Sequence, residues 1–269
     1  MRHPSSGLPA LAGGAAHRRR PRHTRRFARG DDGGRRLRRG AGRGRAVKGP
    51  KRKPSSARWL KRHLADPYVI AARRKGYRSR AAFKLLELDD RFRFLRPGAR
   101  VVDLGAAPGG WTQVAAERVR AGTDGGGRVL AVDLLPMEPV AGAVTITGDF
   151  LDEAVMARLE DALDRPADVV LSDMAPATIG HRGADHLRIM ALAEAAYGFA
   201  SQVLGIGGVF VCKVFQGGTE SGLLAEIKRR FASVRHVKPP SSRPESSEMY
   251  LVAVGFRPEA DRTTGTVSR

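Results

Sequence analysis

The stretch VVDLGAAPGGW at residues 101–111 decides the fold. Its apolar first half ends in Gly105 and is typical of a short buried strand, and the small residues after it predict a tight turn into a helix. Glycines in such a turn let a ligand approach the backbone, and the first turn of the helix presents free N–H groups. The turn is equally compatible with a strand–helix connection that binds nothing. Because the stretch lacks the G-x-G-x-x-G pattern, it disfavours an NAD-binding enzyme.

Strand and helix patterns alternate along the rest of the chain. We predict strands and helices over these ranges: strands at 101–104, 128–134, 168–173, 209–215, 233–238 and 248–256, and helices near 111–120, 185–203 and 219–231. The last two strands are joined by a short polar loop, which predicts an antiparallel pair at one edge. The alternation predicts an α/β fold: a single Rossmann-like domain with a mostly parallel seven-stranded sheet, an antiparallel edge strand and helices on both faces.

Acidic side chains lie at the ends of predicted strands, at the rim where α/β sheets bind ligands. Asp133 is placed to accept hydrogen bonds from both hydroxyls of a ribose, and Asp149 could accept one from an adenine amine. Asp173 adds a third carboxylate at the same rim. Each acid alone is compatible with a solvated loop residue, so the prediction depends on their joint order along the chain.

Lys213 lies inside an otherwise apolar strand. An ammonium is unfavourable there unless it has a partner or a function, although a lysine at a strand end can also extend to solvent. An acidic residue on the neighbouring strand would favour a functional role. Cys212 beside it is predicted to be a small core residue, and as the single cysteine it excludes a disulfide framework and a Cys-based zinc site.

The positive charge of the chain is concentrated at its N-terminus. The 269 residues carry a net charge of +21, and residues 1–55 contain 18 Lys and Arg against two acidic residues. We predict a disordered, basic, Arg/Gly-rich tail that binds polyanions. A transit peptide, or translation that begins near residue 46, remains an alternative for this segment. The chain has no run of 18 apolar residues, so no membrane association is expected, and a reducing, cytoplasmic setting fits the single cysteine.

The stretch from Trp59 to Leu88 predicts one or two helices with a basic face between Lys61 and Arg80. RNA phosphates are the expected partners of this face and of the tail, because such contacts position RNA without reading its sequence. Three side chains outside that charge pattern are further candidates: Arg243 for a phosphate, and Tyr77 and Phe83 for a base, although Phe83 also fits the core.

Five segments together resemble the FtsJ/RlmE-type ribosomal RNA large-subunit methyltransferases. They are SRAAFKL at 79–85, DLGAAPGGW at 103–111, SDMAP at 172–176, KVFQG at 213–217, and the segment from Lys238-Pro239 through Ser241-Ser242-Arg243 to Glu248-Met249-Tyr250. The match runs in order from about residue 58 to 257 and does not cover residues 1–55. We therefore expect a methyltransferase domain at 56–257 that uses S-adenosylmethionine (SAM), between the tail at 1–55 and a disordered end at 258–269.

The resemblance implies an activity and a site. The implied reaction transfers a methyl group from SAM to the 2′-hydroxyl of a uridine in the A-loop of 23S rRNA, within the large ribosomal subunit, and we expect a monomer. The implied catalytic tetrad falls on Lys84, Asp173, Lys213 and Glu248. The implied SAM-contacting positions fall on Gly109, Trp111, Asp133, Asp149 and Asp173. The chain departs from the family at Ala177, where Asn is common.

The ribose 2′-hydroxyl is a poor nucleophile at neutral pH, so its proton must be removed late in the reaction. We hypothesise that Lys213 takes this proton, with its pKa lowered by burial or by the charge of Lys84, while Asp173 and Glu248 orient the two amines. Alternatively, Lys213 only orients the hydroxyl. The acids and the second lysine act in opposite directions on its pKa, which the sequence leaves open.

Other functions stay open at this stage. Methyltransferases of a tRNA ribose, an mRNA cap or a protein share the fold, which does not separate them. A non-catalytic RNA-binding assembly factor is disfavoured by the intact tetrad. No metal is expected, because His181 and His186 lack a third ligand candidate nearby.

Overall fold

The computed structural model describes residues 64–176, 182–216 and 221–258. The tail at 1–55 and nearly all of the end at 258–269 lie outside these residues, as do Trp59, Ala177 and His181. Within the described ranges, none of the helices combines the length and the apolar character that a bilayer span requires.

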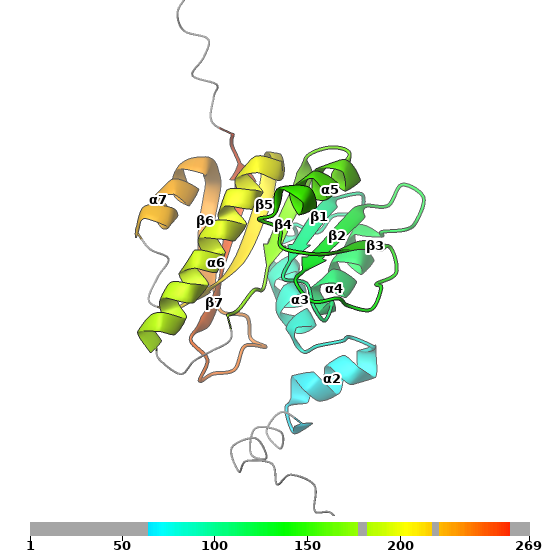
Figure 1. The fold of residues 1–269 in the computed structure, drawn as a ribbon. Helices are drawn as coiled ribbons and strands as arrows, with labels where there is room; N and C mark the ends of the chain where they lie inside the picture. Colours follow the sequence, from blue (N-terminus) through cyan, green and yellow to red (C-terminus); the bar gives the residue numbers. More distant parts are fainter. Residues whose placement is uncertain (1–63, 177–181, 217–220, 259–269) are drawn as a thin grey trace, which may run out of the picture. The chain divides into compact units, whose positions relative to one another are not determined.

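One sheet of seven strands organises the domain (Figure 1). Its strands are β1 (Arg100–Leu104), β2 (Arg128–Asp133), β3 (Ala143–Thr147), β4 (Ala167–Ser172), β5 (Leu204–Phe215), β6 (Phe231–Val237) and β7 (Glu248–Phe256). They lie in the order β3-β2-β1-β4-β5-β7-β6. Neighbouring strands are parallel from β3 to β5, whereas β7 is antiparallel to both β5 and β6. The predicted antiparallel pair at the edge is therefore confirmed, and the reversed strand is β7, one position inside the edge.

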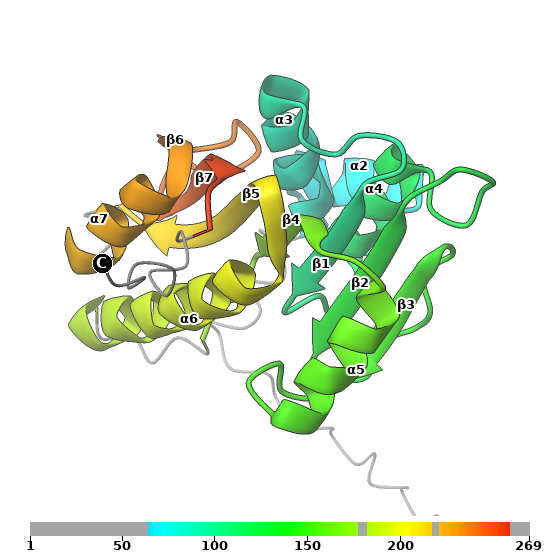
Figure 2. The same cartoon turned by 90° about the horizontal axis from the view of Figure 1, so that it is seen from above.

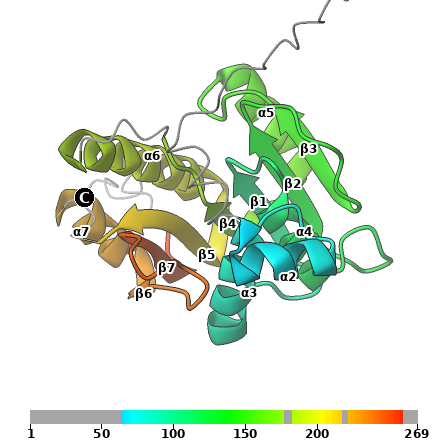
Figure 3. The same cartoon turned by 90° about the horizontal axis from the view of Figure 1, so that it is seen from below.

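Helices cover both faces of the sheet (Figures 2 and 3). The described helices are α2 (Pro67–Lys75), α3 (Ala81–Phe92), α4 (Gly110–Val119), α5 (Glu153–Leu163), α6 (Arg182–Val203) and α7 (Ser221–Arg230). Apolar side chains of α3 and α4 form one core with one face of the sheet, and those of α5, α6 and α7 form a second core with the other face. Successive strand residues alternate between the two cores, as period-two side-chain geometry requires: Val101 joins the first core and Val102 the second.

The sequence patterns missed two elements and shortened a third. Strand β3 is short and half exposed at the edge of the sheet, so it lacks the apolar run that marks a buried strand. Helix α5 begins after Asp152, whose side chain accepts a hydrogen bond from the N–H of Ala154. Strand β5 begins at Leu204 instead of residue 209, because the pairing with β4 shifts register between Ala167 and Val169, beside a glycine-rich stretch of β5.

The strand order reverses between β1 and β4, which creates a crevice beyond their carboxyl ends. The VVDLGAAPGGW stretch at residues 101–111 leads into this crevice. Strand β1 ends at Leu104, and Gly105 turns the chain with φ +72°. A Cβ at Gly105 would lie 2.2 Å from Cγ of Met174, so only glycine fits between the turn and that side chain.

Leu85→Ala should lower the free energy of unfolding by about 2–5 kcal/mol, because Leu85 is fully buried between α3 and the sheet and its truncation leaves a cavity. Urea denaturation followed by circular dichroism measures the change. Leu187→Ala is the matched control: Leu187 on α6 is 71% exposed, and its truncation should change the stability by no more than about 0.5 kcal/mol. Equal effects of the two substitutions would contradict this packing.

Candidate active site

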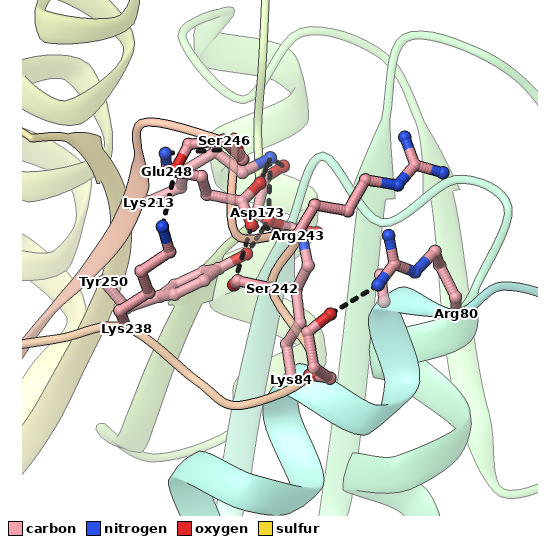
Figure 4. Close-up of polar contacts among 12 residues, drawn as sticks. Arg80, Lys84, Asp173, Lys213, Lys238, Ser242, Arg243, Ser246, Glu248 and Tyr250 are labelled. Atoms are coloured by element: carbon pink, nitrogen blue, oxygen red, sulfur yellow. Dashed lines mark hydrogen bonds and ion pairs between the residues drawn. The ribbon is translucent and has the colours of Figure 1, made fainter. Parts of the chain in front are cut away.

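Four side chains from four different elements meet beyond the carboxyl ends of β4 and β5 (Figure 4). Asp173 directly follows β4, and Lys213 lies near the end of β5, the next strand in the sheet. Glu248 is the first residue of β7, on the other side of β5. Lys84 comes from α3, which packs against one face of the sheet. The structure thus brings together all four residues of the predicted tetrad, including the acidic neighbour that Lys213 requires.

The amines and carboxylates of this tetrad form a chain of ion pairs. Nζ of Lys213 lies 2.8 Å from Oδ1 of Asp173 and donates to the backbone oxygen of the same residue at 2.7 Å. The same nitrogen lies 3.6 Å from Oε2 of Glu248. The other oxygen of that carboxylate, Oε1, lies 2.5 Å from Nζ of Lys84. Glu248 therefore bridges the two lysines, and two positive charges balance two negative ones.

Burial and the neighbouring acids act in opposite directions on the pKa of Lys213. Burial of the side chain, which is 8% exposed, favours the neutral amine. The carboxylates of Asp173 and Glu248 favour the ammonium and outweigh burial, so the pKa of Lys213 lies above its ordinary value. In the protein by itself, Lys213 is therefore an ammonium.

Tyr250 is part of this site, although it was not among the predicted site residues. Its hydroxyl donates to Oδ1 of Asp173 at 2.6 Å, and Nζ of Lys84 lies 5.7 Å from the centre of its ring. Burial and the charges of Asp173 and Glu248 raise the pKa of Tyr250 well above its ordinary value, so its hydroxyl stays a donor. One signal was available: Glu248 and Tyr250 are two apart in one strand, so both side chains lie on the same face.

A cavity of about 880 Å³ opens beside the tetrad at the same rim. Its lining includes three acidic residues at strand ends: Asp133, Asp149 and Asp173. Its apolar lining includes leucines that are otherwise exposed to water, at 64–68% of their surface: Leu134, Leu135 and Leu151. Large exposed leucines around a cavity with convergent acids suit a ligand that has an apolar ring and hydroxyl or amino groups. The donor and acceptor types thus fit the nucleoside part of SAM.

The predicted SAM-contacting residues divide into two groups. Asp133, Asp149 and Asp173 line the cavity, and the carboxylates of Asp133 and Asp149 each also accept a backbone hydrogen bond from the residue two positions on. Asp133 accepts a second one, from the N–H of Ala107 at 2.9 Å, which ties it to the turn after β1. Gly109 and Trp111 are buried and are not part of the described lining. The indole of Trp111 donates to the oxygen of Ala81 at 2.8 Å and so joins the start of α4 to the start of α3. Direct contact of Gly109 and Trp111 with SAM stays a prediction.

The predicted basic face is smaller in the structure than in the sequence. The guanidinium of Arg78 donates to three backbone oxygens, those of Pro108, Glu138 and Pro139. Arg80 donates to the oxygen of Ser241 and pairs with Asp66 at 3.1 Å. Both arginines thus hold protein loops together. The exposed cations of the described part of this face lie in the last turn of α2: Arg73, Arg74 and Lys75.

The two aromatic candidates for base stacking form part of a cluster. Phe83 is half-buried, with its ring centre 5.4 Å from that of Tyr68 and 6.0 Å from that of Tyr77. The hydroxyl of Tyr77 donates to Glu117 at 3.0 Å. Stacking on a base stays a prediction. Cys212 is a core residue as predicted, since it is only 2% exposed. Burial raises the pKa of its thiol to about 12.

The family model described as FtsJ-like methyltransferase matches residues 77–256, which contain the sheet, the cavity and the tetrad. The chain belongs to this family. Curated proteins named ribosomal RNA large subunit methyltransferase E are similar to it. The one from Rhodospirillum rubrum is 60% identical over 206 residues, covering 77% of this chain and 78% of the relative. The one from Parvibaculum lavamentivorans is 54% identical over 239 residues, covering 85% and 94%.

A solved structure agrees with this FtsJ-like fold. The structure described as a putative ribosomal RNA methyltransferase from Plasmodium falciparum aligns with a TM-score of 0.60 at 32% identity, covering 67% of this chain and 98% of that one. The predicted mostly parallel sheet with helices on both faces is confirmed by this likeness and by the observed strand order.

Asp103 is a buried carboxylate beneath the site, 1% exposed, and it accepts a hydrogen bond from Oγ1 of Thr112 at 2.7 Å. Burial raises its pKa from 3.8 to about 7, and the charges of Asp173 and Asp133 add to this. The native state therefore binds more protons than the unfolded chain between these pH values. The stability that Asp103 contributes is present below pH 3.8 and is lost as the pH rises through 7.

Asp103→Asn should therefore stabilise the protein at pH 8 and change it little at pH 4, because the amide keeps an acceptor for Thr112 and carries no charge. Each pKa unit corresponds to about 1.4 kcal/mol, so a difference of a few kcal/mol is expected. Urea denaturation at both pH values measures it. Asp161→Asn on the exposed side of α5 is the control, and an equal pH response of the two variants would contradict the assignment.

Proposed function

We propose that this FtsJ-like enzyme transfers a methyl group from SAM to the 2′-hydroxyl of a uridine in the A-loop of 23S rRNA, in the large ribosomal subunit. The observation that carries the proposal is the meeting of Lys84, Asp173, Lys213 and Glu248 beside a cavity that Asp173 also lines. The names of the curated relatives support ribosomal RNA of the large subunit as the substrate class.

The cavity supports SAM as the methyl donor. When bound, SAM supplies a methyl group on a sulfonium, which is a good leaving group. Asp133 and Asp149 would hold the nucleoside through its hydroxyl and amino groups, and the apolar rim would exclude water from its ring. Asp173 lies both in the wall of the cavity and in the tetrad, so it joins the cofactor side of the site to the proton-transfer side.

Lys213 is the group that we propose to act on the hydroxyl. As an ammonium it can donate a hydrogen bond to the ribose oxygen and hold it in line for attack. To accept the hydroxyl proton at Nζ, it must first release one of its own protons to solvent. A second positive charge in the site favours that loss, and Lys84 carries one on the far side of Glu248.

We also propose how the chain is organised and which surface contacts the rRNA. Residues 56–257 would form one methyltransferase domain, residues 1–55 an RNA-binding tail, and residues 258–269 a disordered end. The enzyme would act as a monomer in the cytoplasm. Phosphates of the rRNA would lie along the last turn of α2, where three exposed cations follow one another.

Mapping of 2′-O-methylation on rRNA from a strain that lacks this protein tests the function. We expect one mark to be missing, at a uridine of the 23S A-loop, and to return when the gene is restored. Purified large subunits from that strain should then accept a methyl group from SAM in vitro. An unchanged methylation map, with no acceptance by the subunits, would refute the proposed substrate.

Lys213→Ala should lower the turnover on large subunits by about 10²–10⁴-fold, which is the usual contribution of a positioned acid–base group. Lys213→Arg separates the two roles, because a guanidinium keeps the charge and the donors but does not give up its proton. If Lys213 is the base, Arg should be as inactive as Ala; if it only orients the hydroxyl, Arg should retain part of the rate. Single-turnover methyl transfer measures both. Lys228→Ala on α7 is the control. Near-normal turnover of Lys213→Ala would exclude both roles, that of the base and that of the orienting group.

Replacing Arg73, Arg74 and Lys75 together by Gln should weaken binding to deproteinised rRNA and make it less dependent on salt. The slope of log affinity against log salt should fall by about one for each phosphate that the helix no longer neutralises. Filter binding between about 50 and 200 mM salt measures the slope. Lys228→Gln with Arg235→Gln, on α7 and β6, is the control pair. An unchanged slope in the α2 variant would exclude this helix as a phosphate-binding element.

A further inference from the structure

Asp66 joins three parts of the chain that are far apart in the sequence. Its Oδ1 accepts from the N–H of Tyr68 at 3.0 Å and so caps the start of α2. Its Oδ2 pairs with Arg80 at 3.1 Å and with Arg243 at 3.2 Å. The residue is 9% exposed, and its carboxylate is thus buried between two guanidiniums.

Arg80 and Arg243 both connect Asp66 to the loop that precedes Glu248. Arg243 belongs to this loop, at residues 238–247 between β6 and β7. Arg80 donates to the backbone oxygen of Ser241 in the same loop. The loop is therefore connected to Asp66 in two ways: directly through Arg243, and indirectly through Arg80.

The same loop is fastened to α3 and to the tetrad. Glu87 of α3 accepts from the backbone N–H of Ser241 at 2.8 Å and from its hydroxyl at 2.7 Å. Further along, the hydroxyl of Ser242 donates to Oε1 of Glu248 at 3.3 Å, which is also the oxygen that pairs with Lys84. A shift of the loop would thus move the carboxylate that bridges the two lysines.

Arg80 stands immediately before α3, four residues ahead of Lys84. The carboxylate of Asp66 is consequently linked to the start of α3, which supplies Lys84, and to the loop that leads into Glu248 at the start of β7. On its other side it caps α2, whose last turn carries the cations that we assign to RNA.

We infer that Asp66 is a positioning residue that couples the RNA-facing helix α2 to the placement of Lys84 and Glu248. The inference rests on the proposed function, because it assigns α2 to the rRNA. Charge is the means of coupling: burial alone would raise the pKa of Asp66, but Arg243 and Arg80 outweigh it and lower the pKa, so the carboxylate is ionised at neutral pH. Movement of α2 on the rRNA is thereby transmitted to the loop and to α3.

Two substitutions separate this role from simple helix capping. Asp66→Asn keeps an oxygen that caps α2, because Asn and Asp are equally good at this position, but it removes the charge that both arginines share. Asp66→Glu keeps the charge and gives up the short side chain that capping requires. If Asp66 acts through charge, Asn should be the more damaging change; if it only caps α2, Glu should be.

We expect Asp66→Asn to lower kcat on large subunits by at least about tenfold, since small displacements of reacting groups have effects of this size, and to leave the KM for SAM within about twofold. Asp66→Glu should retain more of the rate. Asp152→Asn is the matched control, because Asp152 caps α5 in the same way away from the tetrad. A normal kcat in Asp66→Asn, or a lower kcat in Asp66→Glu than in Asp66→Asn, would overturn the inference.

Amide hydrogen exchange of the full chain without RNA tests the positioning role of Asp66 without depending on the proposed function. Asp66→Asn should speed exchange at residues 241–248 by at least about tenfold and leave α5 unchanged. If exchange is faster in Asp66→Asn but the wild-type protein does not methylate large subunits, the proposed function is refuted. The positioning role of Asp66 is then still supported. Unchanged exchange at 241–248 would overturn the inference whatever the wild-type protein methylates.

Discussion

The pairing of Lys213 with two carboxylates is the interaction on which the site depends. An isolated ammonium inside a protein is strongly unfavourable, and removing one partner of a buried pair leaves an uncompensated charge. Here Asp173 and Glu248 neutralise Lys213 and Lys84, so the four charges balance. The strand order makes this possible. If β6 paired with β5, β7 would lie one strand further out, about 4.8 Å away, and Glu248 would not reach Lys213.

The sequence predicted the residues at strand ends far better than those on helices and loops. Asp133 ends a strand, Asp173 follows one and Lys213 lies near the end of a third. The carboxyl ends of parallel strands share one rim whatever the remaining packing. No such rule places Lys84, which comes from a helix; its role was implied only by the resemblance to the FtsJ-like family. Strand β3 was not delimited because its side chains are half exposed, and hydrophobic periodicity is the main signal for a strand.

The arginines show a further limit of sequence reading. Charge counting treats each cation of the 61–80 stretch as a surface group, yet Arg78 and Arg80 use their donors on backbone oxygens of distant loops. A guanidinium has five N–H donors in a fixed plane, which lets one side chain join several carbonyls. The acceptors lie up to 161 residues away, so no local pattern reveals them. Charge in the sequence therefore overstates the number of cations that are free for a partner such as RNA, and the hydrogen bonds show which arginines are already engaged within the protein.

The resting tetrad also constrains how a hydroxyl can enter it. Lys213 has three N–H groups, and Asp173 takes two of them, at 2.7 and 2.8 Å. The third faces Glu248 at 3.6 Å, beyond the usual hydrogen-bond range, while the same carboxylate holds Lys84 at 2.5 Å. A ribose oxygen that accepts from Lys213 would therefore displace the weakest contact and leave the Asp173 and Lys84 pairs intact. In the proposed reaction, Glu248 would lose its contact with Lys213 and keep its ion pair with Lys84. Lys84 would thus have a role in the site without contacting the RNA.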